Sequence, residues 1–229
     1  MTITLITGAN KGLGYETARR LISAGHDVWI GARDVRRGHT AAEELGAHFV
    51  QLDVTDDRSV AAAVETVHAE AGRVDVLVNN AGILGTRKPA AETSADDVRE
   101  AFETNVFGVV RVTHAFLPLL QTSDTPQVIN VTSGLGSFTL ITETEWGRFG
   151  TLSYSSSKAA LTMLTVQYAR AIPGIRFNAV DPGYTGTDFN GHRGPQTVQE
   201  GTDRIVRLAL LGPDAPTGTL SDRNGTVPW

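Results

Sequence analysis

The chain has 229 residues, of which 41% are hydrophobic and 20% are charged, and its formal net charge is -5. This size and composition fit one globular domain over residues 1–229 and argue against a disordered or fibrous chain. The charges form no basic stripe for nucleic acid or a membrane surface. No segment reaches the ~20 apolar residues of a membrane span, and cysteine is absent. We therefore expect a cytoplasmic protein.

Two kinds of segment alternate along the whole chain and predict its fold. Short β-branched runs are separated by longer, alanine-rich amphipathic stretches. This pattern is typical of parallel β-α-β units with right-handed crossovers. We therefore predict an α/β fold of the Rossmann type, a doubly wound parallel sheet of about seven strands with helices on both faces. The expected strands are residues 3–7, 27–32, 48–52, 74–79, 127–132 and 176–180, with a further short candidate at 218–221.

Helix boundaries are marked by residues with special backbone preferences. Asp56 and Ser94 are expected N-caps, the latter with Asp97 three residues later. Pro118 lies late in the helix that contains Asn105 and is expected to end or kink it. Glycines just past the expected helix ends are Gly25, Gly72 and Gly174.

The first expected strand leads into a glycine-rich turn with the sequence TGANKGLG. Glycines permit a close approach of the backbone to a pyrophosphate, and the amides at the start of the next helix attract anions. The spacing G-x-x-x-G-x-G differs from the general G-x-G-x-x-G pattern, so an ordinary strand-to-helix turn is an alternative. The candidate phosphate-binding residues of this turn are Gly8, Asn10, Lys11, Gly12, Leu13 and Gly14.

The end of the second expected strand indicates which dinucleotide the chain binds. An acidic residue there would hold the ribose hydroxyls of NAD, whereas this chain has Ala32 followed by Arg33. The guanidinium of Arg33 offers paired donors to a 2′-phosphate, and Lys11 adds a second cation. The pattern favours NADP(H), with a surface pair between Arg33 and Asp34 as the alternative.

The third strand is followed by Asp53 and Val54, which could reach the adenine edge through the carboxylate and a backbone amide. Asp53 could equally cap the turn that follows it.

Tyr154 and Lys158 lie four residues apart in a stretch that reads as a helix, so they share one face of it. This spacing brings a phenol, which can act as an acid or a base, beside a cation. Together with the glycine-rich turn it indicates hydride chemistry at a carbonyl. A solvent-facing helical pair is the alternative interpretation.

In this order and on this framework, the motifs resemble those of the short-chain dehydrogenase/reductase family over essentially the whole chain. TGANKGLG resembles the cofactor turn of the family, and Asn105, the first residue of NVFG, resembles its helix asparagine. Asp181-Pro182-Gly183 followed by Thr187 resembles its loop on the nicotinamide side. The residues resembling the fourth-strand element are Asn79, Asn80, Ala81 and Gly82, and those resembling the catalytic tetrad are Asn105, Ser133, Tyr154 and Lys158.

The resemblance implies a role for each member of this tetrad. Tyr154 would donate a proton to the substrate oxygen in reduction, and Ser133 would hydrogen-bond the same oxygen. Lys158 would also bind the nicotinamide ribose, and Asn105 would hold a water linking the lysine to solvent. From the residues alone, Ser133 could be a helix cap and Asn105 could satisfy a nearby backbone carbonyl.

The loop after the sixth strand adds Pro182, Gly183, Thr185 and Thr187 as candidate cofactor contacts. Its two threonines could bond the carboxamide or a phosphate of the cofactor, or only turn the chain. The loop is also shorter than the helical lid usual in the family, which suggests an open pocket.

The pKa of a free tyrosine is near 10, and moving it to about 7 requires about 4 kcal/mol of preferential stabilisation of the phenolate. An exposed ion pair supplies about 1 kcal/mol at most, whereas a charge about 4 Å away in a partly desolvated site supplies roughly that amount. Lys158 is therefore expected to be shielded from bulk water by bound cofactor.

We predict an NADPH-dependent oxidoreductase that reduces a ketone or aldehyde to an alcohol, or catalyses the reverse oxidation. The alternative is a non-catalytic NADP(H)-binding sensor; an epimerase or dehydratase is disfavoured because the chain lacks room for an extra substrate domain. No histidine pair has metal-binding spacing, so no metal is assigned.

The expected partners are a small-molecule substrate and further copies of the chain, as a homodimer or homotetramer, without nucleic acid or membrane. An apolar or aromatic substrate cleft is expected from Leu135, Phe138, Trp146, Phe149, Tyr184 and Phe189.

Overall fold

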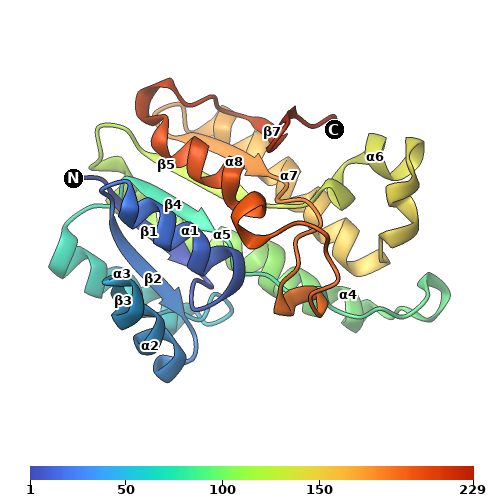
Figure 1. The fold of residues 1–229 in the computed structure, drawn as a ribbon, viewed down its shortest axis with the longest axis horizontal. Helices are drawn as coiled ribbons and strands as arrows, with labels where there is room; N and C mark the ends of the chain where they lie inside the picture. Colours follow the sequence, from blue (N-terminus) through green and yellow to red (C-terminus); the bar gives the residue numbers. More distant parts are fainter.

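An eight-stranded sheet runs through the centre of the protein (Figure 1), in a computed structural model that describes residues 1–229 apart from the side chain of Trp146. The strand order is β3-β2-β1-β4-β5-β6-β7-β8. Neighbours from β3 to β7 pair in parallel, whereas β8 pairs antiparallel to β7. The strands are β1 (Ile3–Thr7), β2 (Asp27–Ala32), β3 (His48–Gln51), β4 (Val76–Asn79), β5 (Gln127–Val131), β6 (Arg176–Val180), β7 (Thr219–Asp222) and β8 (Gly225–Thr226).

The predicted fold class is confirmed, and the sheet differs from the prediction in one strand. All seven expected strands form, with ends that differ by at most two residues. The eighth strand was not expected, because its two residues give no periodic pattern. It forms because Asp222 accepts hydrogen bonds from the backbone N–H groups of Asn224 and Gly225, which turns the chain back on itself.

Helices cover both faces of this sheet (Figure 1). Apolar residues of α1, α2 and α8 form one buried cluster with one face of the strands, and residues of α3 and α5 form a second cluster with the other face. Leu5 belongs to the second cluster and the next residue, Ile6, to the first, as expected when successive strand residues point to opposite faces. The α-helices are α1 (Gly12–Ser23), α2 (Val35–Leu45), α3 (Asp57–Ala71), α4 (Ala95–Phe102), α5 (Gly108–Gln121), α6 (Phe138–Glu143), α7 (Leu152–Ala171) and α8 (Val198–Leu210).

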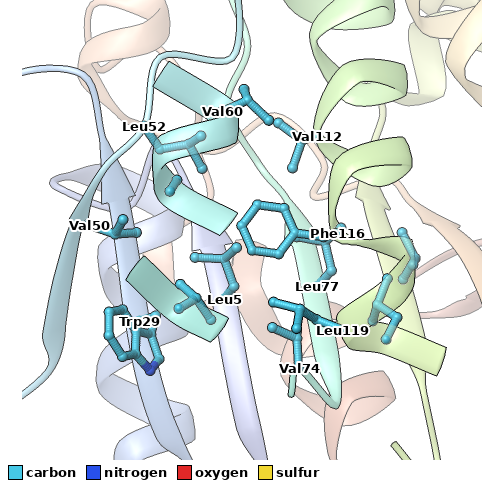
Figure 2. Packing of buried hydrophobic residues seen from close by; sticks show 14 of the residues in the cluster. Leu5, Trp29, Val50, Leu52, Val60, Val74, Leu77, Val112, Phe116 and Leu119 are labelled. Atoms are coloured by element: carbon cyan, nitrogen blue, oxygen red, sulfur yellow. The ribbon is translucent and has the colours of Figure 1, made fainter. Parts of the chain in front are cut away.

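Phe116 anchors the packing of α5 on the sheet. Figure 2 shows its ring pointing toward Leu5 of β1 and Leu77 of β4, and all three side chains are fully buried. Burying one phenylalanine side chain contributes about 1.5–3 kcal/mol to stability. This packing fixes α5, and with it the preceding turn that carries Asn105.

The structure refines three expectations about helices. Pro118 does not end its helix, which continues to Gln121. Asn105 lies in a π-helical turn, η2 (Glu103–Phe107), between α4 and α5. Gly174 follows the end of α7 without a left-handed conformation, whereas Gly72 is the left-handed C-cap of α3. The expected caps Asp56 and Ser94 are confirmed, and Ser94 forms a full capping box with Asp97.

Within the described part of the chain, no helix has both the length and the apolar character that crossing a bilayer requires.

Candidate active site

A cleft of about 1310 Å³ runs along the carboxyl ends of the strands. Residues that directly follow β1, β2, β3, β4, β5 and β6 line it, among them Gly8, Arg33, Asn80 and Asp181. In a doubly wound sheet, ligands bind at this edge because loops diverge there. The cleft therefore brings together segments from nearly the whole sequence.

Hydrogen bonds fix the glycine-rich turn against the loop after β4. Gly8 has a φ of +65°, and a Cβ atom there would lie 2.9 Å from Cα of Ala81. The amide of Asn80 donates to the carbonyls of Thr7 and Gly8, at 2.9 and 3.1 Å. The hydroxyl of Thr7 accepts from the backbone N–H groups of Asn80 and Ala81. Only glycine fits this close contact between the turn and the loop after β4.

Most predicted cofactor residues line this one cleft. They are Gly8, Asn10, Lys11, Gly12, Leu13, Arg33, Asp53, Val54, Asn80, Ala81, Gly82, Tyr154, Lys158, Pro182, Gly183, Thr185 and Thr187.

Gly14 and Asn79 depart from this arrangement and pack against neighbouring elements instead. A Cβ atom on Gly14 would lie 2.8 Å from Cα of Ala9, so this glycine allows α1 to sit close to the turn. Asn79 is buried, and its amide donates to Thr113 on α5 and to Asn130 on β5, at 3.1 and 2.9 Å. These bonds tie β4 to its neighbours rather than directing the side chain into the cleft.

Arg33 directly follows β2, Lys11 is the N-cap of α1, and both residues line the cleft. Asp34 caps α2 by accepting from the backbone N–H of Arg37 at 3.0 Å, and its carboxylate lies 3.7 Å from the Arg37 guanidinium. The acid next to Arg33 is thus engaged elsewhere. Lys11 pairs with Asp188 at 3.0 Å, which links the glycine-rich turn to the loop after β6.

Asp53 caps the turn that follows it, as the alternative interpretation of this residue predicts. Its Oδ1 accepts from the backbone N–H and the hydroxyl of Thr55, at 2.9 and 2.7 Å. Asp53 also lines the cleft. Its bonds within the turn therefore do not prevent it from lying beside the adenine end of a cofactor.

Ser133, Tyr154 and Lys158 converge at the other end of the cleft. Tyr154 and Lys158 are 8% and 4% exposed, and the Lys158 Nζ atom lies 5.7 Å from the centroid of the Tyr154 ring. The ammonium group donates to the carbonyl of Val131 at 2.9 Å. Ser133 hydrogen-bonds Tyr154 through its side chain, and its Oγ accepts from the backbone N–H of Leu135 at 3.1 Å. The pair is therefore not solvent-facing, even without cofactor.

Burial shifts the pKa values of both helix residues toward their neutral forms. Desolvation raises the pKa of Tyr154; the Ser133 hydrogen bond opposes this rise, and the Asp181 charge adds to it. Desolvation lowers the pKa of Lys158 to about 8. The protein alone thus keeps Tyr154 protonated, which is the form that acts as an acid. The expected lowering toward 7 does not come from Lys158 by itself.

Asn105 joins the loop after β4 to α7. Its Oδ1 accepts from the backbone N–H of Ile83 at 2.8 Å, and its amide donates to the Ile83 carbonyl and to Ser157 at 2.9 and 3.0 Å. A Cβ atom on Gly82 would lie 3.2 Å from Asn105 Oδ1 and 3.6 Å from Lys158 Nζ. The side chain therefore satisfies backbone groups, and the π-helical turn, a feature frequent at functional sites, places it there.

Aromatic rings form the wall on the substrate side. The Phe189 ring lies 6.0 Å from that of Tyr154, and Phe149 lies 6.5 Å from Tyr184. Leu135 also lines the cleft. Phe138 instead points into solvent, with 74% of its surface exposed. The expectation for Trp146 lies outside the described side chains.

The loop after Gly183 is short but tightly connected within itself. The buried Asn190 donates to the Thr185 carbonyl at 2.8 Å and accepts from the backbone N–H of Arg193 at 3.2 Å. A β-bridge pairs Thr185 with Gln196. The loop is consequently a folded wall of the cleft rather than a long helical lid.

The C-terminal segment completes the opposite wall. Val227 packs with Ala179 and Leu220, and the carbonyl of Trp229 accepts from the backbone N–H of Thr139 at 3.0 Å. Figure 1 shows this end of the chain on the same side of the molecule as α6.

Asp181 is a site residue that was missed among the candidates. It directly follows β6, lines the cleft and accepts from the backbone N–H of Gly183 at 2.9 Å. An acidic residue immediately after a buried strand was the available signal. Among the described residues, no group of three or more His, Cys, Asp or Glu side chains is arranged to hold a metal ion.

Comparisons with known proteins agree with this site. The family model for short chain dehydrogenases matches residues 2–197. Short-chain dehydrogenase/reductase 1 from Saponaria officinalis is 35% identical, with 98% of this chain and 95% of that protein covered. The (+)-neomenthol dehydrogenase from Capsicum annuum is 31% identical, with 93% of each chain covered. The NADPH-bound carbonyl reductase from chicken fatty liver has a TM-score of 0.88 and 27% identity, with both chains covered completely. The protein is thus an oxidoreductase that belongs to the short-chain dehydrogenase/reductase family.

Proposed function

We propose that the whole chain forms one NADP(H)-binding catalytic domain, which reduces a ketone or aldehyde to an alcohol or catalyses the reverse oxidation. The observation that carries the proposal is the meeting of Ser133, Tyr154 and Lys158 in one cleft with the glycine-rich turn. A dinucleotide is long enough to join the two ends of such a cleft, and its phosphates favour the start of a helix.

The residues at the turn fit a dinucleotide phosphate. Gly8 and Gly12 have φ values of +65° and +59°, and the space beside Gly8 is too small for a side chain. The backbone thus comes to the edge of the cleft at the start of α1. When bound, the cofactor supplies or accepts the hydride.

NADP(H) is the proposed form of the cofactor. Arg33 and Lys11 offer positive charge beside β2, and Asp34 turns its carboxylate to α2. A 2′-phosphate favours such a pair of cations, whereas an acid at the strand end would repel it. The NADPH-bound carbonyl reductase with the same fold supports this choice.

Tyr154 is the proposed acid in reduction and base in oxidation. Its hydroxyl gives its proton to the substrate oxygen as the carbonyl carbon gains hydride, and Ser133 donates a hydrogen bond to the same oxygen. Lys158 stabilises the phenolate that remains. Its Nζ atom lies 5.7 Å from the centroid of the Tyr154 ring, and a cation so near favours the charged form of an acid.

The substrate is proposed to be a hydrophobic carbonyl compound. Phe149, Tyr184 and Phe189 offer ring faces to the cleft beside Tyr154, and Leu135 adds an aliphatic contact. Pockets of this kind bind apolar ligands and use a few polar groups for orientation.

A homodimer or homotetramer is the proposed assembly. Phe107, the last residue of η2, and Met163 of α7 are 48% and 58% exposed. Light scattering coupled to gel filtration tests this. A cytoplasmic location stays a prediction, which cell fractionation tests.

A screen of ketones and aldehydes that follows NADPH oxidation tests the function. We expect turnover with apolar carbonyl compounds and NADPH. Ser133→Ala should lose most of it, whereas Ser156→Ala, at an exposed position on α7, should retain it. Tight NADPH binding without turnover across the screen would contradict the proposal and favour a sensor.

A further inference from the structure

Asp181 is a partly buried acid to which the proposed proton transfer assigns no role. It directly follows β6 and lines the main cleft. It also lines a second, polar cavity of about 30 Å³, on the side of α8 and β7. Asp181 thus places a carboxylate between two cavities, one of which Tyr154 lines. Packing alone does not explain an acidic residue at this position.

The carboxylate joins the loops that follow β5 and β6. Its Oδ1 accepts from the backbone N–H of Gly183 at 2.9 Å, and the backbone N–H of Gly134 also hydrogen-bonds the group. A Cβ atom on Gly134 would lie 2.7 Å from Asp181 Oδ2, so the carboxylate rests directly on this glycine. Gly134 follows Ser133 in the chain. Asp181 thereby fixes the backbone beside the serine that contacts Tyr154.

Among the described residues, no cation forms an ion pair with Asp181. The negative charge of Asp181 therefore acts on Tyr154 without being neutralised by a direct partner. Burial raises the pKa of Asp181, the bonds from Gly183 and Gly134 lower it, and the charge of Asp222 raises it again. Asp181 in turn raises the pKa of Tyr154. Among charged or titratable groups, Glu200 and Arg204 on α8, Asp222 on β7 and Arg223 in the β7–β8 turn line the small cavity together with Asp181, and Tyr154 and Lys158 on α7 line the main cleft.

We propose that Asp181 is a positioning residue of this site, whose carboxylate holds the Ser133–Gly134 loop in place beside Tyr154. The inference rests on the proposed function. Asp181 neither gives nor takes a proton in the reaction; it sets the pH at which Tyr154 changes from acid to base. Removing a nearby negative charge favours an anion, so the phenolate should form at lower pH.

The experiment compares wild type with Asp181→Asn in the NADP⁺ complex. The rate constant kcat/KM for oxidation of an alcohol rises with pH as Tyr154 loses its proton. We expect the midpoint of that rise to move down by about 1 pH unit in Asp181→Asn. Asp181→Ala, which places no amide against Gly134, should give the same shift. Asp222→Asn is the control. Its side-chain oxygen still accepts hydrogen bonds in the β7–β8 turn, and the midpoint of the kcat/KM profile should not move.

A second measurement does not need turnover. The phenolate absorbance of the NADP⁺ complex, corrected with Tyr154→Phe, should titrate at a pH lower by the same amount in Asp181→Asn. An unchanged midpoint in this titration overturns the effect of Asp181 on Tyr154, and an unchanged kcat/KM at every pH in Asp181→Ala overturns its positioning role. If the absorbance shifts but no alcohol is oxidised, the proposed function fails while the effect of Asp181 on Tyr154 stands.

Discussion

Lys158 lowers the stability of the folded protein without cofactor, and its removal should therefore stabilise the chain. The side chain is 4% exposed, and desolvation lowers its pKa from 10.5 to about 8. At pH 7 the lysine is charged in both the folded and unfolded states. The shift then corresponds to about 3 kcal/mol of lost stability. Lys158→Met removes that cost but leaves the Val131 carbonyl without this donor, at about 1 kcal/mol. The net expected gain is about 2 kcal/mol.

The pH dependence distinguishes this cause from better packing. Between pH 8 and 10.5 the unfolded chain holds the lysine proton and the folded chain does not, so wild-type stability rises with pH relative to Lys158→Met. The advantage of the variant is complete below pH 8 and disappears near pH 10.5.

Urea unfolding of the cofactor-free protein, followed by tryptophan fluorescence at pH 7 and pH 10, measures both effects. Lys88→Met is the matched control, because Lys88 is exposed and pairs with Asp97 at 2.9 Å. It should cost at most about 1 kcal/mol, without a comparable dependence on pH. A Lys158→Met variant that is less stable than wild type at pH 7, or equally stabilised at both pH values, would refute the reasoning.

Three further variants test the cofactor end of the site and its support. Arg33→Asp should weaken NADPH binding by at least tenfold and NADH binding much less, since it removes a donor to the 2′-phosphate; fluorescence titration with both cofactors measures this. Gly8→Ala should cost about 2 kcal/mol more than Gly25→Ala in thermal unfolding, because both positions have positive φ but only Gly8 meets another backbone. Asn105→Ala should cost about 2–3 kcal/mol, because Ile83 loses two hydrogen bonds, and urea unfolding measures it.

For each of the three variants, one result would contradict the prediction. Equal losses of NADPH and NADH in Arg33→Asp would remove the basis for NADP(H), and Arg36→Asp, an exposed arginine on the following helix, is the control for general charge effects. Equal costs for the two glycine variants would mean that the close contact at Gly8 is unimportant. An Asn105→Ala variant as stable as wild type would mean that Ile83 finds other partners.

The strands of the sheet centre could be predicted because β1, β4 and β5 are short, fully buried runs, as parallel sheets require. Figure 1 shows the resulting order, in which β1 lies between β2 and β4. The strand β8 could not be found by periodicity in two residues. Its signal was the stretch from Asp222 to Gly225, because Asp at the first and Gly at the fourth position are typical of a β-turn.

Two adjacent asparagines show which feature of the site could not be predicted from the sequence. Asn79 and Asn80 looked equivalent, yet Asn80 bonds the glycine-rich turn and lines the cleft, while Asn79 bonds Thr113 and Asn130. Which of two neighbours faces the cleft depends on where β4 ends, and that is decided by packing. The prediction of NADP(H) is supported by the NADPH-bound carbonyl reductase with this fold.

The electrostatics of Tyr154 could not be predicted from spacing. A spacing of four residues places Tyr154 and Lys158 on a shared helix face, but it does not fix the depth of burial, which raises the pKa of the tyrosine and lowers that of the lysine. The expected shielding of Lys158 comes from the protein itself, through Val131 and the walls of the cleft.

The central claim is that the Tyr154 hydroxyl protonates the substrate oxygen beside the bound cofactor. A single-turnover measurement of NADPH oxidation by a ketone, in wild type and in Tyr154→Phe with equal cofactor occupancy, tests it most directly. The account predicts a loss of at least about 10²–10⁴-fold in the rate of hydride transfer, with NADPH binding unchanged. A Tyr154→Phe variant that transfers hydride at a rate close to that of wild type would contradict it.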